Sequence, residues 1–140
     1  MQELTDVLDR ERRLLEMVLF KLVEARHLLV ADEARFLPWA SAELERAVER
    51  VREATLLRAV VAQRVAVAHG LPAESTLMIL LAQADEPFAA ILAEQQEALH
   101  RLIGEIRDEV ARAGSLAERQ LRGIDAVLAA VSELQEARAE

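Results

Sequence analysis

The residues of this chain best suited to chemistry are two glutamate–histidine pairs with the spacing Glu-x-x-His. Glu24 precedes His27, and Glu97 precedes His100. Two such pairs on facing helices, with two further glutamates, make up the ligand set of di-iron carboxylate bundles. Metal ligands in a bundle must point inward, whereas the apolar spacing around each pair places these side chains on the outward face of a helix. We therefore interpret them as surface residues and expect neither a metal nor a cofactor.

The rest of the chain offers few catalytic side chains. It contains no cysteine, no tyrosine and only three histidines. The few serines do not stand in the context of a nucleophile elbow, and no glycine-rich phosphate loop occurs. We therefore expect that the protein is not an enzyme.

The composition predicts one soluble helical domain. Of 140 residues, 53% are hydrophobic but only 3% are aromatic, so the core must consist of leucine, valine, isoleucine and alanine, as in packed helices. The net charge of −8 disfavours binding to nucleic acid and to anionic membranes. The longest apolar run, residues 77–82, is too short to cross a bilayer. With no cysteine and a polar N-terminus, we expect a cytoplasmic location.

Heptad spacing predicts an antiparallel pair of long helices in the first half of the chain. Leucines recur every seven residues at Leu8, Leu15, Leu22 and Leu29, within a helix expected over residues 3–36. Pro38 suits the first turn of a second helix over residues 38–69, in which large residues alternate with alanine along the apolar seam. Gly70 is expected to end that helix. A shared seven-residue repeat favours side-by-side packing.

Two charged residues interrupt the apolar seams of these helices. Glu11 lies on the seam of the first helix and Arg58 on the seam of the second. In a hairpin that turns near residue 36, the two lie at similar distances from the turn. They could form a partly buried ion pair that fixes the register. Alternatively, Arg58 extends its apolar stem to reach solvent.

The second half of the chain predicts a short helix over residues 75–84 and a long amphipathic helix over residues 86–137. A bend in the long helix is expected near residues 113–115, the sequence Ala-Gly-Ser, where the apolar stripe changes phase. The expected fold is therefore all-α: an antiparallel hairpin of long helices, a short helix and a long C-terminal amphipathic helix in a bundle or coiled-coil-like arrangement, forming one domain over residues 1–140.

The predicted C-terminal helix is longer than the helices that could cover it. About 50 residues span ~75 Å, whereas each earlier helix of about 30 residues spans ~45 Å. Its surplus apolar face requires a cover: a fold-back of the chain, a second copy, or another protein. We expect the function to reside in this segment.

The same pattern resembles the FlgN family of flagellar export chaperones. The similar features are the leucine-rich first helix and charged second helix of residues 4–64, the segment Gly70-Leu71-Pro72 followed by Thr76-Leu77 and Leu80-Leu81, then Pro87 and the long last helix. The terminal pattern also fits: Leu116 to Leu121, followed by Ile124 and Leu128.

This resemblance implies a cytoplasmic chaperone, without enzymatic activity or cofactor, that binds the hook–filament junction proteins FlgK and FlgL. It would mask their assembly-prone termini and deliver them to the type III export apparatus, with the export gate as a further partner. By resemblance, client contact would involve the apolar face of the C-terminal helix: Leu116, Leu121, Ile124, Val127, Leu128, Val131 and Leu134.

The alternative is a structural coiled-coil protein without a client, whose last helix pairs with its own copy. Both interpretations allow a homo-oligomer when no client is bound. The chaperone interpretation predicts that the residues after about Ala113 are mobile or weakly paired in the free protein.

Overall fold

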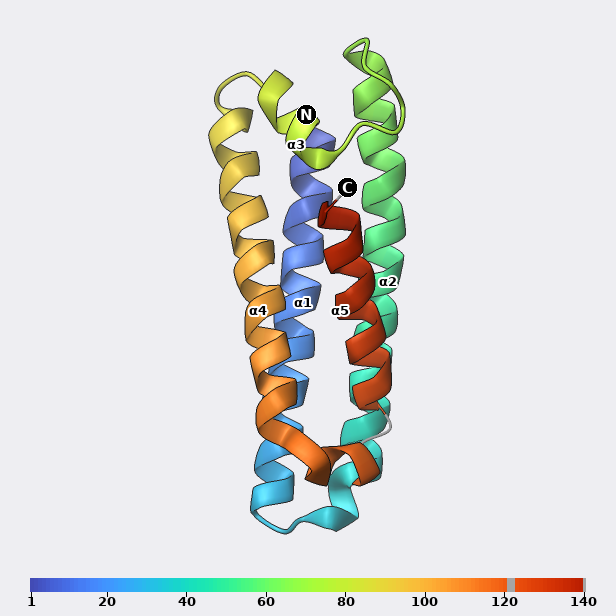
Figure 1. Ribbon diagram of the computed structural model, residues 1–140, viewed down its shortest axis with the longest axis vertical. Helices are drawn as coiled ribbons and strands as arrows, with labels where there is room; N and C mark the ends of the chain where they lie inside the picture. Colours follow the sequence, from blue (N-terminus) through green and yellow to red (C-terminus); the bar gives the residue numbers. More distant parts are fainter. Residues whose placement is uncertain (121–122, 140) are drawn as a thin grey trace.

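The structure is a computed structural model that describes the backbone of residues 1–120 and 123–139 and the side chains of residues 1–113 and 126–136. Within these residues the chain forms five α-helices, one turn of 3-10 helix and no strand, which confirms the predicted all-α class. The helices are α1 (Gln2–Val30), α2 (Leu37–Ala68), α3 (Leu77–Gln83), α4 (Phe88–Gln120) and α5 (Gly123–Ala139). The long helices run side by side, and α5 lies along them (Figure 1).

Helix α1 is the centre of the bundle because it packs against both α2 and α4. Its leucines at positions 8, 15 and 22 are at most 2% exposed, as the heptad spacing predicts. They meet a seam of small and branched residues on α2, namely Ala40, Leu44, Ala47, Val48, Val51, Ala54, Val61 and Val65. On the other side, α4 contributes Leu92, Leu99, Ile103 and Ile106.

The first helix ends earlier than the sequence pattern predicts. α1 stops at Val30, and a separate 3-10 turn covers Ala34–Phe36, so a continuous helix over residues 3–36 is wrong. The cause is local: Asp32 adopts a left-handed backbone conformation with φ of 57°, which aspartate tolerates better than most residues. The N–H of Glu33 then donates to the carbonyl of Leu28 at 2.9 Å and closes the helix end.

Helix α2 ends where its glycine predicts. Gly70 has φ of 71°, and the N–H of Leu71 donates to the carbonyl of Ala66 at 2.9 Å, as in a Schellman cap. After this turn Thr76 caps α3, its hydroxyl oxygen accepting from the N–H of Ile79 at 3.3 Å. The fully buried Leu80 fixes α3 across the end of the bundle.

Two glycines provide a matched test of this backbone. A Cβ added at Gly70 or at Gly104 would meet no atom within 4 Å, so sterics with neighbours are equal. We expect Gly70→Ala to destabilise the fold by about 1–2 kcal/mol because of its positive φ. We expect Gly104→Ala, in the interior of α4, to stabilise it by up to about 1 kcal/mol. Urea denaturation followed by circular dichroism measures both, and equal signs would contradict the assigned backbone.

The C-terminal half does not form one rod. The expected single helix over residues 86–137 is divided into α4, which continues as a helix through residues 113–115 to Gln120, and α5, which begins at Gly123. In Figure 1 the last turns of α4 swing across the lower end of the bundle, and α5 returns antiparallel to α4. The described part of the surplus apolar face is therefore covered by a fold-back, one of the three covers that the sequence left open.

Candidate functional site

Helix α5 turns most of its described apolar side chains into its own bundle. Val127, Val131 and Leu134 are 1%, 6% and 3% exposed, whereas Leu128 is 43% exposed. Of the seven residues predicted to contact a client, these four can be placed. The side chains of Leu116, Leu121 and Ile124 lie outside the described residues. Among the four placed residues, only Leu128 is available to a partner without movement of α5.

The surface beneath α5 is contributed by three helices. Leu15 and Val18 come from α1, Val48 and Val51 from α2, and Ile106 from α4, and together they face Val127, Ala130, Val131 and Leu134. All of these side chains are buried. The contact therefore consists of aliphatic groups, which favour burial but specify no single partner geometry.

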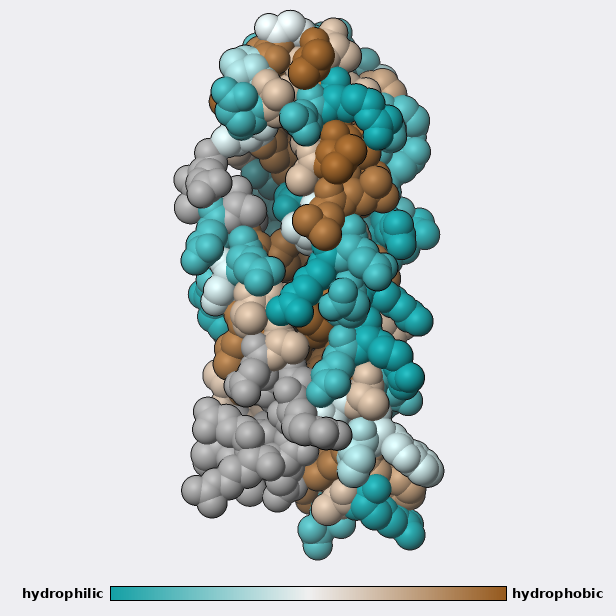
Figure 2. Space-filling view, turned by 90° about the vertical axis from the view of Figure 1, so that its right-hand side faces the viewer, coloured by the Kyte–Doolittle hydropathy of each residue, from teal (hydrophilic) through white to brown (hydrophobic). Residues whose placement is uncertain are grey.

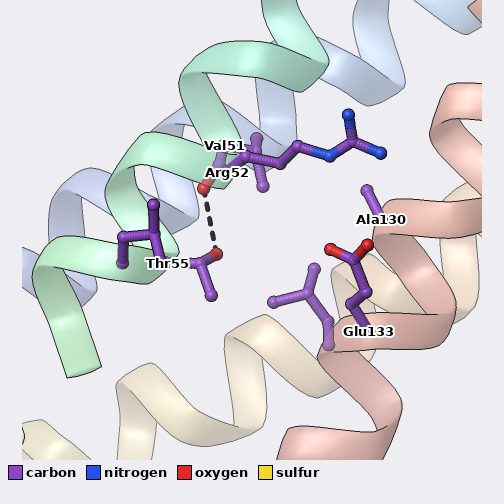
Figure 3. Close-up of a pocket in the computed structure, with 7 residues that line it drawn as sticks. Val51, Arg52, Thr55, Ala130 and Glu133 are labelled. Carbon is purple, nitrogen blue, oxygen red and sulfur yellow. Dashed lines mark hydrogen bonds between the residues drawn. The ribbon is translucent and has the colours of Figure 1, made fainter.

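A hollow of about 230 Å³ remains between α2 and α5. It is lined by Val51, Arg52, Thr55, Leu56, Ala130, Glu133 and Leu134. Figure 3 shows Arg52 and Glu133 extending from opposite helices toward one another, while the hydroxyl of Thr55 donates to the carbonyl of Val51 at 2.9 Å. The packing between α2 and α5 is thus incomplete, with an apolar floor and a charged rim.

Polar contacts join the long helices to one another. Between α1 and α2, Arg64 bonds Glu3 at 3.0 Å, and Lys21 bonds Glu43 at 2.7 Å. The Lys21–Glu43 hydrogen bond raises the pKa of Lys21 and lowers the pKa of Glu43. Between α1 and α4, Arg26 pairs with Glu109. By contrast, the side chains of residues 126–136 form no hydrogen bond or ion pair with a described residue of another helix. Toward the described part of the bundle, this stretch of α5 makes apolar contacts.

The predicted pairing of Glu11 with Arg58 is confirmed. Nε of Arg58 lies 3.0 Å from Oε2 of Glu11, and their side chains are 14% and 1% exposed. Burial raises the pKa of Glu11, and Arg58 opposes that rise. Within the described residues, Oε2 accepts no hydrogen bond of good geometry, so the contact is electrostatic and offsets only part of the desolvation. Because the folded pKa is raised, Glu11 contributes stability at low pH that is lost as the pH rises through that pKa.

A second buried carboxylate was not predicted from the sequence. Glu109 on α4 is 2% exposed and pairs with Arg26 of α1 and, at 3.2 Å, with Arg112 of its own helix. Its spacing could have predicted the burial, because Glu109 lies on the apolar seam of α4, three residues after Ile106 and four before the buried Ala113. Like Glu11, it is a charge on an apolar seam that predicts a basic partner on the facing helix.

The two Glu-x-x-His pairs lie on the bundle surface. His27, Glu97 and His100 are exposed, and Glu24 is half-buried with its carboxylate 3.8 Å from Nζ of Lys21. In the part of the chain that is described, no group of three or more residues is arranged to hold a metal ion. The outward orientation inferred from the apolar spacing therefore holds for the three exposed side chains.

Taken together, the described residues form an all-helical bundle in which α5 packs on an apolar groove contributed by α1, α2 and α4. No helix among the described residues is both long and apolar enough to cross a membrane. A comparison with protein families matches residues 1–139 to the family described as FlgN protein. The chain belongs to the FlgN family, whose members are flagellar export chaperones. Comparisons with curated proteins and with solved structures find no significant match.

Proposed function

We propose that this protein is a cytoplasmic flagellar export chaperone that binds and masks the assembly-prone termini of hook–filament junction proteins of the FlgK and FlgL type. It would then deliver them to the type III export apparatus, where the export gate is a further partner. Family membership supports the general role. The observation that carries the finer proposal is that the described side chains of α5 form no hydrogen bond or ion pair with the described residues of the other helices.

In this proposal α5 and the chain before it form the client-binding surface. Leu128 is accessible while α5 is docked. Val127, Val131 and Leu134 become accessible when α5 leaves its groove. The proposed client surface also includes Leu116, Leu121 and Ile124, whose side chains lie outside the described residues. The client is an amphipathic helix whose aliphatic residues recur at steps of three and four, because that is the spacing α5 presents.

The energy of docking fits a reversible exchange. Burying Val127, Val131 and Leu134 contributes about 5–9 kcal/mol before other terms. The loss of conformational freedom when α5 is held on the bundle opposes this gain. A client helix that offers comparable apolar contacts would compete with the bundle for α5.

The alternative function, a structural coiled coil that pairs through its last helix, finds less support. That pairing would need the face of α5 that carries Val127, Val131 and Leu134, which already packs into the bundle. Self-association, if it occurs without a client, must use another surface or displace α5.

A single substitution tests the proposed client surface. We expect Leu128→Glu to weaken capture of a FlgK- or FlgL-type protein from the same genome by at least about 30-fold, since Leu128 would lose ~2 kcal/mol of burial and place a charge in the interface. Its stability should change by less than about 0.5 kcal/mol because the side chain is exposed in the free protein. Calorimetric titration and thermal melting measure the two effects.

The matched control is Ala129→Glu, which adds the same charge to the next position of the same helix, also exposed. It should retain capture. Unchanged capture by Leu128→Glu, or a large loss of its stability, would remove Leu128 from the client surface.

A further inference from the structure

Several large aliphatic residues are exposed together on the outer face of α2. Leu56, Val60 and Val67 are 70%, 52% and 61% exposed, and the neighbouring Leu57 is 38% exposed. In Figure 2, which looks onto the α2 side, an apolar patch occupies the upper half of the face and polar residues surround it. A row of exposed aliphatic groups on a helix whose opposite face already fills the core requires an explanation.

The spacing of these exposed residues indicates that the surface suits packing against another helix. On the outer face, the exposed positions 53, 57, 60, 64 and 67 follow one another at alternating steps of four and three. That is the heptad period by which two helices pack side by side with a left-handed crossing. Helix α2 therefore carries two seams: an inner one filled by α1, and an outer one built for another helix.

The charged residues at the two ends of the row indicate which kind of helix can bind there. Glu53 lies one turn before Leu57, and Arg64 lies one turn after Val60, both on the outer side of α2. Glu53 has no ion pair with any described residue. Arg64 binds Glu3 at 3.0 Å, but its side chain is 61% exposed and can reach a second carboxylate. The row thus has an acidic end and a basic end of matched distance from its centre.

We propose that the outer seam of α2 binds a second copy of this chain, as an antiparallel, two-fold symmetric pair. With the two-fold axis beside residues 58 and 59, Leu57 of each copy faces Val60 of the other. Glu53 then faces Arg64 of the other copy, and symmetry repeats this ion pair at the opposite end. A parallel pair would instead place glutamate against glutamate and arginine against arginine. This proposal does not depend on client capture.

Charge exchange tests the pairing directly. We expect the natural chain to form a concentration-dependent dimer of twice its 15.6 kDa mass in sedimentation equilibrium. Glu53→Arg and Arg64→Glu should each weaken self-association by at least about tenfold, because each converts two attractions into two repulsions. An equimolar mixture of the two variants should recover the dimer, since both ion-pair positions of the mixed pair again join one arginine to one glutamate.

Three controls keep the result interpretable. Glu97→Arg, an equal charge change on the exposed face of α4, should leave the dimer intact. Val60→Glu should abolish the dimer, and thermal melting should show that every variant is folded. A natural chain that stays monomeric, single variants that still dimerise, or a mixture that stays monomeric would each overturn the proposal. So would a monomeric natural chain whose client capture is lost on Val60→Glu, because the seam would then belong to the client.

Discussion

Replacing Arg58 with methionine is expected to destabilise the fold by about 3–5 kcal/mol, the largest effect of any substitution of a charged residue considered for this protein. The variant leaves the carboxylate of Glu11, 1% exposed, without the guanidinium that lies 3.0 Å away. Glu11→Met should cost much less, because Arg58 is 14% exposed and can turn its head group to water. The double variant should return close to the stability of the natural chain, since an apolar pair removes both desolvation costs.

The pH dependence of the same variants provides a second readout. Arg58 opposes the rise in the pKa of Glu11 that burial causes, so Arg58→Met should raise that pKa further. The folded protein then binds more protons than the unfolded chain, and the unfolding free energy should fall as the pH rises through the folded pKa. The double variant should lose this slope. Urea denaturation at a series of pH values measures it. A stability of Arg58→Met within about 1 kcal/mol of the natural chain at neutral pH would contradict the burial assigned to Glu11.

The ion pair between Glu11 and Arg58 is an example of a contact that could be predicted from the sequence. Charged residues on an otherwise apolar seam have few acceptable positions, so Glu11 and Arg58 identify one another once the hairpin is assumed. Gly70 is equally informative, because few residues tolerate the positive φ that ends α2. The end of α1 is not predictable in this way, because aspartate also occurs within helices and adopts the positive φ seen at Asp32, 57°, much less readily than glycine does.

The division of the last helix was harder to predict for a physical reason. The apolar steps of α4 and α5 both follow a helical period, and the change of phase near residues 113–115 indicates a bend without showing that the chain reverses. Glycines within a helix interior lower stability without specifying a break. The chain reverses after α4 because α5 can then pack against α2 and α4. This packing exists only in the assembled bundle and is not visible in the local sequence pattern. A sequence pattern shows that an apolar face needs a cover, but not whether the cover is the same molecule or a guest.

The candidate site shows the same ambiguity at the level of single residues. Val127, Val131 and Leu134 have the composition and spacing of a client-binding face, and in the free protein that face is packed on the aliphatic side chains of α1, α2 and α4. Leu128 shares the pattern and yet is exposed. The proposed chaperone function is compatible with both the buried and the exposed residues of this face if α5 can leave its groove.

Locking α5 in place is therefore expected to abolish client capture, the second large effect. The chain contains no cysteine, so no native thiol competes with an engineered pair. Val51 of α2 and Ala130 of α5 line the same hollow, so we choose these two positions for the cysteine pair. In the oxidised protein, the fraction of molecules with α5 undocked falls to the fraction that is not cross-linked, and apparent affinity falls in proportion.

The reduced form of the same protein is its own control. It should capture the client like the natural chain, and the single variant Ala130→Cys should be insensitive to oxidation. Thermal melting of both redox forms verifies that the cross-link leaves the bundle folded.

Client capture by the Val51→Cys/Ala130→Cys protein, measured before and after reduction, tests the release of α5 most directly. We expect the oxidised protein to bind a FlgK- or FlgL-type client at least about 100-fold more weakly than the reduced protein, with full recovery after dithiothreitol. Equal binding by the fully cross-linked and the reduced protein would show that α5 stays docked during capture, and would contradict the proposed exchange.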